Sequence, residues 1–226
     1  MKTPISLACL AVIVSLQTVS ADSVEMRTPP ATEAEKEAVY TVAIEARTAD
    51  ILKQAGITDA AKSNAVHEVI IAQYRALRTR DAGIDGQLKT DGREVNYANR
   101  AARLQAESKL LHEKFLARLA ASLTPEEVEK IKDGLTYKKV QVTYNAYCEI
   151  VPNLTDADKA KILEQLKLAR EEAMDGGNAP EKSEIFQKHK DQINAELAAK
   201  GIDVAKLTKE WEAKRDAEKK TTEAAK

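Results

Sequence analysis

The sequence predicts an all-α fold, organised as a single compact domain of six to eight helices. Aromatic residues make up 4% of the 226 residues and charged residues 31%, and the chain contains eight glycines and six prolines. Sheets and tight turns need β-branched, aromatic and turn-forming residues, so this composition disfavours sandwiches, barrels and parallel α/β sheets. The helix-favouring residues alanine, leucine, glutamate, lysine and glutamine are abundant. The near balance of 35 basic and 36 acidic residues excludes the basic surface of a nucleic-acid-binding protein.

Residues 1–21 have the features of a secretory signal peptide. Lys2 supplies a positive charge, residues 5–16 are mainly apolar, and residues 19–21 match the small-residue pattern that precedes cleavage. The apolar run of roughly a dozen residues is too short to span a bilayer, and no second long apolar segment follows. We therefore expect an exported protein, periplasmic or extracellular, whose mature chain has no transmembrane segment.

Helix start and stop signals divide the rest of the chain. We expect an extended leader over residues 22–31, a helical domain over residues 32–218 and a charged, frayed tail over residues 219–226. Helices are expected from 32 to the glycine at 56, from 58 to about 80, from about 94 to 121, from 124 to the glycine at 134, over 145–151, from 155 to the loop at 176–180, from that loop to the glycine at 201, and from 204 onward. Residues 81–92, with three glycines, are expected to form a polar turn region, with the alternative that the preceding helix frays into them and does not stop cleanly. Residues 140–143 fit either an extended or a helical conformation.

Three helix starts share an aliphatic residue, a threonine, and then aspartate or proline, at residues 57–59, 123–125 and 154–156. A threonine hydroxyl can accept a hydrogen bond from a first-turn amide, so we expect three threonine N-caps, although a degenerate internal repeat is an alternative explanation. Thr32 and Glu35 fit a capping box. Apolar residues at helical spacing predict the buried side of the first helix: Val39, Val42, Ala43, Ala46 and Leu52. In the last helix, Trp211 is expected to be a core residue.

The sequence offers no metal or nucleophile motif. His67-Glu68 and His112-Glu113 begin like zinc-protease motifs but lack the second histidine four positions after the first. Cys148 is the one cysteine that remains after cleavage, so a thiolate cluster and an intramolecular disulfide are both ruled out. We therefore expect no metal and no cofactor, and we expect Cys148 to be a small buried apolar residue.

Glycan cleavage is a weaker hypothesis. Residues 107–108 and 144–146 match parts of lytic transglycosylase motifs, but Tyr147 stands where that family has glycine. With 36 acidic residues in the chain, such short matches are expected by chance. We therefore favour a non-catalytic protein over an enzyme.

Residues 137–149 are the best candidate for ligand binding. Sugars present C–H faces that stack on aromatic rings, and hydroxyls that pair with amide, carboxylate and cationic groups. The segment supplies these groups in Tyr137, Lys138, Tyr144, Asn145, Tyr147 and Glu149. Tyr144 and Tyr147 are three residues apart and also fit one buried face of a helix, so either a core or a ligand-binding role remains open for them.

Residues 123–128, 132–137, 144–155 and 169–176 together resemble domain of unknown function family 3826, a family of exported bacterial proteins. The resemblance extends from about Val39 to Trp211 and implies a carbohydrate-related role, because sugar binding is ascribed to the family; it implies no catalytic residue. The helix starts are also similar to the Leu-Thr-x-x-Gln motifs of periplasmic chaperones of the Spy and CpxP class, with Glu127 or Asp158 in place of glutamine. We therefore expect a protein that binds carbohydrate or a carbohydrate-handling partner, with a periplasmic chaperone or stress adaptor as the alternative.

Overall fold

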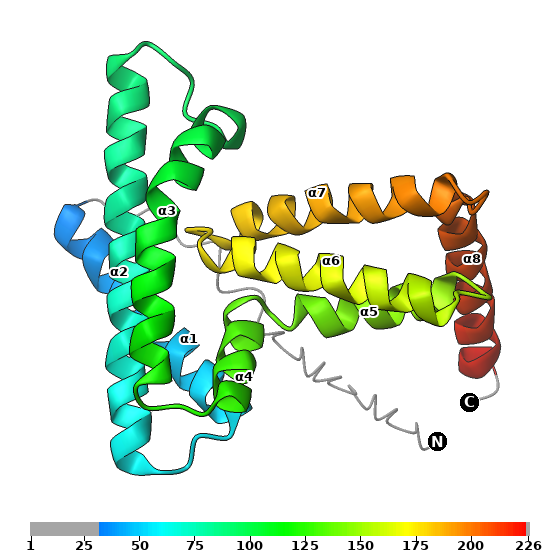
Figure 1. Cartoon of the computed structure of the whole chain (residues 1–226), viewed down its shortest axis with the longest axis horizontal. Helices are drawn as coiled ribbons and strands as arrows, with labels where there is room; N and C mark the ends of the chain where they lie inside the picture. Colours follow the sequence, from blue (N-terminus) through cyan, green and yellow to red (C-terminus); the bar gives the residue numbers. More distant parts are fainter. Residues whose placement is uncertain (1–31, 225–226) are drawn as a thin grey trace, which may run out of the picture. The chain divides into compact units, whose positions relative to one another are not determined.

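The computed structural model describes residues 32–224, and these residues form eight helices without a strand among them (Figure 1). The all-α prediction is confirmed, whereas the predicted signal peptide and leader lie outside the described residues. The helices are α1 (Glu33–Ala55), α2 (Ala60–Thr90), α3 (Tyr97–Ala120), α4 (Pro125–Leu135), α5 (Lys139–Ile150), α6 (Asp156–Met174), α7 (Ala179–Ala198) and α8 (Val204–Ala224). None of them combines the length and the apolar character that crossing a membrane requires.

The chain divides into one unit that ends at Thr41 and a second unit from Val42 to Lys226. The described part of the first unit is the start of α1. There the amide of Glu35 donates to Oγ1 of Thr32 (3.2 Å), and the amide of Thr32 donates to Oε2 of Glu35 (2.8 Å). This reciprocal pair is the predicted capping box.

Of the residues predicted to form the buried side of α1, Leu52 is buried and the others are not. Val39 and Val42 are 61% and 69% exposed, and Ala43 and Ala46 are exposed as well. The buried positions follow a different helical stripe: Ile44, Thr48, Ile51, Leu52 and Ala55. The reason is that α1 has apolar residues on opposite sides, and the side with the larger isoleucines packs into the core.

Two of the three expected threonine caps are confirmed. Thr124 and Thr155 each form a complete capping box, with Glu127 and Asp158 as the reciprocal partners. At the start of α2, however, the cap is Asp59, whose Oδ1 accepts from the amide of Lys62 at 2.7 Å. The prediction of a threonine cap is wrong there because aspartate caps as well as threonine and lies one residue closer to the helix.

The expected polar turn at residues 81–92 is also wrong over most of its length, because α2 continues to Thr90. Ile84 and Leu88 extend the buried stripe of α2 and form a small cluster with Leu104 of α3. Burial of these side chains offsets the helix penalty of about 1 kcal/mol for each internal glycine. Farther along the chain, α5 begins at Lys139, so residues 140–143 are helical and Val140 is buried.

Two apolar cores account for most of the buried side chains. The first core is formed by the four helices α1, α2, α3 and α4, around Ile51, Ile70, Leu119 and Ile131. Met174 at the end of α6 also packs into it. The second joins α5 to α8; its largest contributions include Leu166 of α6 and Phe186 and Ile193 of α7. The turn between α4 and α5 connects the two cores along the chain.

Candidate functional site

The α4–α5 turn has an unusual backbone. Tyr137 and Lys138 have φ values of 58° and 54°, in the left-handed region. The amide of Lys138 donates to the carbonyl of Asp133 (2.7 Å), and the amide of Tyr137 donates to that of Gly134 (3.2 Å). This pattern is a Schellman motif, which places Tyr137 at the position where helices normally have glycine. A bulky residue at positive φ is rare, because its Cβ crowds the neighbouring carbonyl oxygen.

The ring of Tyr137 is held against α1 while its residue remains 44% exposed. The Cζ atom of Arg47 lies 4.1 Å from the ring centroid, within the range of a cation–π contact. Nη2 of Arg47 donates to the carbonyl of Gly134 at 2.5 Å, which fixes the guanidinium over the ring. Gly134 also packs closely on Ile51, since a Cβ at Gly134 would lie 3.0 Å from Cγ2 of that side chain. These contacts hold the turn against α1, while Tyr137 exposes part of its aromatic ring to solvent.

The other predicted site residues lie on two sides of α5. Lys138, Asn145 and Glu149 are exposed and follow one helical stripe, together with Gln141, whose Nε2 donates to Oδ1 of Asn145 at 2.7 Å. Tyr147 is buried on the side that faces α7. The ligand role of these residues stays a prediction, but the accessible ones are next to Tyr137 or on this stripe.

The two other tyrosines contribute to the second core to different degrees. Tyr147 donates from its hydroxyl to Oδ1 of Asn194 at 2.7 Å, and burial raises the pKa of Tyr147 to about 12. Tyr144 is half-buried against the same core. A hydrogen bond with the thiol of Cys148, one turn along α5, raises the pKa of the Tyr144 hydroxyl.

Two further predictions about apolar residues are wrong. Cys148 is exposed rather than buried, because the next helical position after the inward Tyr147 already points away from the core. Trp211 is half-buried and lies outside the second core cluster, with Cζ of Arg215 4.5 Å from its ring centroid. The packed part of α8 is its start, where Val204 and Leu207 contact the core.

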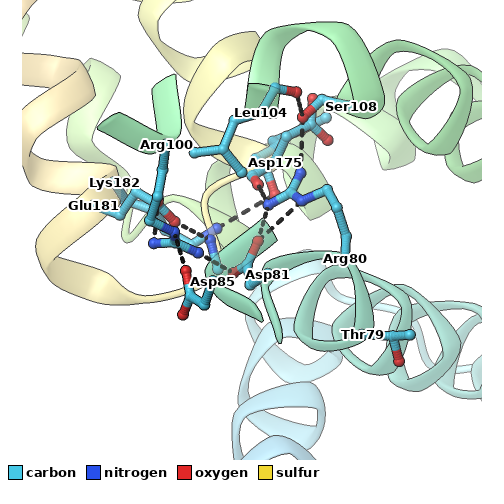
Figure 2. Close-up of polar contacts among 12 residues, drawn as sticks. Thr79, Arg80, Asp81, Asp85, Arg100, Leu104, Ser108, Asp175, Glu181 and Lys182 are labelled. Carbon is cyan, nitrogen blue, oxygen red and sulfur yellow. Dashed lines mark hydrogen bonds and ion pairs between the residues drawn. The ribbon is translucent and has the colours of Figure 1, made fainter. Parts of the chain in front are cut away.

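A buried cluster of charged side chains, which the sequence did not predict, joins α2 and α3 to the α6–α7 loop (Figure 2). Arg80 of α2 is 7% exposed and donates to Oδ1 of Asp81 (2.9 and 2.7 Å), Oγ of Ser108 (2.7 Å) and the carbonyl of Asp175 (2.7 Å). Ser108 in turn donates to the carbonyl of Leu104 at 2.6 Å. Ser108 is therefore committed to this cluster, which gives no support to the glycan-cleavage hypothesis.

Arg100 of α3 extends the cluster to α7. Its guanidinium lies 3.2 Å from Oδ2 of Asp81, 2.9 Å from Oδ1 of Asp85 and 3.0 Å from Oε1 of Glu181. Figure 2 shows Asp81 placed between the two arginines. The second oxygen of Glu181 accepts from the amide of Gly177 at 2.6 Å, so the carboxylate also closes the α6–α7 loop.

Lys182 and His112 complete this polar region. Lys182 is 3% exposed, its Nζ donates to the carbonyl of Ala173 (3.0 Å), and burial lowers the pKa of Lys182 to about 8. Nδ1 of His112 lies 3.0 Å from Oδ2 of Asp175, and this hydrogen bond raises the pKa of His112 above its ordinary value. Glu171 acts in the same direction and Lys132 opposes it.

The charges of this cluster are matched, and their geometry is that of a structural connection. Each buried guanidinium contacts at least one carboxylate, and the lysine caps the last carbonyls of α6, where a cation is favourable. In the described part of the chain, no group of three or more His, Cys, Asp or Glu residues is arranged to hold a metal ion. The α4–α5 turn, with its exposed and prepositioned aromatic ring, is the better candidate for ligand binding.

A family model described as "Protein of unknown function (DUF3826)" matches residues 41–217. The chain belongs to this family. The match includes both the α4–α5 turn and the buried charged cluster, so both are features of the family's domain as it occurs in this chain. A comparison with curated proteins gave no match. The DUF3826 description assigns no activity, and the function must therefore be argued from the residues of the turn.

Proposed function

We propose that this DUF3826 protein is exported and binds carbohydrate at the α4–α5 turn without catalysing a reaction. The observation that carries the proposal is the position of Tyr137, an exposed ring on a left-handed backbone with Arg47 behind it. Residues in the left-handed region cost roughly 1–3 kcal/mol and are found preferentially at ligand sites. Glycine would avoid this cost, so the presence of tyrosine is explained if its ring has a use.

The chemistry of the turn fits a sugar. The apolar face of a pyranose stacks on an aromatic ring, and a ring that is already fixed loses little conformational entropy on binding. Arg47 provides this fixation through its contacts with the Tyr137 ring and the Gly134 carbonyl. The proposed mechanism is therefore recognition by a preformed platform.

Polar groups continue from the platform along α5. Lys138, Gln141, Asn145 and Glu149 offer cationic, amide and carboxylate groups on one exposed stripe. With a rise of about 1.5 Å per residue, this stripe extends about 16 Å from Lys138 to Glu149. A stripe of that length suits an oligosaccharide better than a single sugar. Tyr147, which is buried, is not part of the proposed contact surface.

A glycan array followed by calorimetry tests the proposal, with cell-wall and plant oligosaccharides as ligands. Tyr137→Ala should weaken binding about tenfold or more, since one aromatic contact contributes about 0.5–1.5 kcal/mol beyond the area it buries. Tyr147→Phe is the matched control, because it changes a tyrosine of the same segment that points into the core. Absence of glycan binding, or binding that Tyr137→Ala leaves unchanged, would refute the proposal.

A periplasmic chaperone is the second candidate, and the observation that favours it is a set of exposed aliphatic side chains. Val42, Val142 and Leu168 are 69%, 64% and 52% exposed. The Leu-Thr helix starts add nothing to this candidate, because Thr124 and Thr155 act as ordinary capping residues. A chaperone would suppress aggregation of unfolded clients at stoichiometric amounts, and Tyr137→Ala would not change that effect.

A further inference from the structure

We infer that the carbohydrate bound at the α4–α5 turn is anionic, with carboxylate or sulfate groups on its sugars. The inference rests on the proposed function of this turn and specifies the class of its ligand. It depends on which charges around Tyr137 are already paired and which are not.

The acidic side chains in the part of α4 that precedes Tyr137 are ion-paired. Oδ1 of Asp133 lies 2.7 Å from Nη1 of Arg170, a side chain that is itself 5% exposed. Glu129 pairs with the same guanidinium and also with Nζ of Lys132 at 3.1 Å. Glu171 also pairs with both Arg170 and Lys132, so these two cations reduce the negative potential of the three carboxylates without cancelling it.

The basic side chains at the turn have no such partners. Among the residues that the structure describes, neither Lys138 nor Lys139 forms an ion pair, and neither does Arg47. Arg47 donates to a carbonyl and stacks on a ring, contacts that leave its charge uncompensated. Asp50, three residues along α1, makes no ion pair with it. Arg47 thus stacks on the exposed ring without a counter-charge. The unpaired Lys138 and Lys139 directly follow that ring along the chain, and Nζ of Lys139 lies 6.0 Å from the ring centroid of Phe186.

The unpaired guanidinium of Arg47 contrasts with the buried arginines of the charged cluster. The full chain has a formal net charge of −1, and the guanidinium groups of Arg80 and Arg100 are each paired with carboxylates (Figure 2). An anionic ligand would supply the missing counter-charges.

The start of α5 adds to the positive potential. Lys138 is the N-terminal flanking residue of α5 and makes no side-chain cap hydrogen bond, and the first turn contains no acidic residue. The other helices in residues 32–224 all have a side-chain oxygen as their N-cap acceptor. The amide of Lys139 donates to the carbonyl of Thr136 (3.1 Å), and the remaining first-turn amides, which have no side-chain acceptor, favour an anion over a neutral group.

The test compares two ligands with the same sugar backbone, one charged and one neutral: galacturonate oligosaccharides of defined length, and the same oligosaccharides with every carboxylate converted to its methyl ester. Calorimetry should show about tenfold tighter binding of the acidic form at low salt, and the difference should shrink at about 0.5 M salt, where exposed charges are screened. The double variant Lys138→Gln/Lys139→Gln should bind both forms equally. Lys209→Gln, which removes an exposed lysine from α8, is the matched control and should keep the preference.

The outcomes separate this inference from the proposed function. Equal binding of both forms that is lost in Tyr137→Ala would overturn the anionic assignment and leave carbohydrate binding intact. A preference for the acidic form that persists in the double lysine variant would also overturn it, because the charge would then act elsewhere. If neither these nor any arrayed glycans bind, the proposed function itself fails.

Discussion

Glycine and alanine at position 137 should reveal whether the turn that carries Tyr137 is strained. Both substitutions remove the ring and its contact with Arg47. The difference between their free energies of unfolding therefore reports the effect of the backbone conformation alone. Alanine at a φ of 58° pays the left-handed penalty of roughly 1–2 kcal/mol, which glycine avoids. Glycine in turn loses about 0.5–1 kcal/mol more conformational entropy on folding. Tyr137→Gly should therefore be more stable than Tyr137→Ala by about 0.5–1 kcal/mol.

Urea denaturation of the two variants measures this difference directly, provided that both share the same dependence on urea concentration. Val142, which is exposed within α5, offers a matched control with ordinary helical backbone. There the order should reverse, with alanine more stable than glycine by about 1 kcal/mol. Opposite orders of stability at positions 137 and 142 would exclude the explanation that glycine stabilises this chain at any position.

Measurement of carbohydrate binding provides a second test with the same two variants, Tyr137→Gly and Tyr137→Ala. Because both variants lack the ring, they should lose carbohydrate affinity equally although their stabilities differ. If Tyr137→Gly is no more stable than Tyr137→Ala, the left-handed backbone costs no more than the roughly 0.5–1 kcal/mol that glycine loses in conformational entropy. The argument that a functional ring keeps tyrosine at this position would then be refuted.

Three further predictions concern the packing around the two cores. Gly177→Ala should lower the free energy of unfolding by about 1–3 kcal/mol in urea denaturation, because its Cβ would lie 1.8 Å from Oδ2 of the ion-paired Asp81; an unchanged midpoint would contradict this. The hydrogen bond of His112 with Asp175 raises the pKa of the histidine, so its stabilising contribution is complete below the unfolded pKa of about 6.5 and is lost as the pH rises through the folded pKa; His112→Gln should flatten the stability profile in that window, and an unaltered profile would exclude this role. Tyr147→Phe should cost about 1 kcal/mol in thermal unfolding through its lost hydroxyl hydrogen bond while glycan binding persists, and lost binding would place this residue in the site.

Helix existence and most helix starts could be predicted because their signals are local. Thr124 with Glu127, and Thr155 with Asp158, satisfy first-turn amides within four residues of sequence. At residues 58–59 the local signal is ambiguous, since threonine and aspartate both cap, and the structure uses Asp59. Local reasoning identified the kind of feature there and missed its position by one residue.

The errors arise where distant residues decide the outcome. The glycines near residues 83–86 indicate a turn, but Ile84 and Leu88 reach Leu104 of α3 and keep α2 helical. In α1 the sequence shows apolar residues on opposite sides of the helix. Which side is buried depends on the helices that pack against it, and the predicted stripe of Val39 and Val42 is exposed.

The candidate site was predicted in part for the same reason. The composition of residues 137–149 selected the segment of the candidate site, and Gly134 near the end of α4 indicated that Tyr137 follows a helix end. No sequence pattern pointed to Arg47, which lies 90 residues before Tyr137 and contacts its ring. Contacts between residues of different helices, such as Arg47 and Tyr137, leave no local sequence pattern. The charged residues of this chain are spread evenly, so their positions do not indicate which of them pair.

The buried charged cluster explains how two separate apolar cores form one structure. An apolar contact between the cores would tolerate sliding, whereas Arg80 and Arg100 each engage several fixed acceptors at once. A network of this kind contributes little net stability, because desolvation of the charges offsets their attraction, but removal of one member leaves a buried charge unpaired. Its effect is therefore mainly on geometry. Since Arg170 extends the same polar contacts to Asp133 in α4, this network also fixes the helix whose end carries Tyr137. The proposed platform thus depends on residues remote from any ligand.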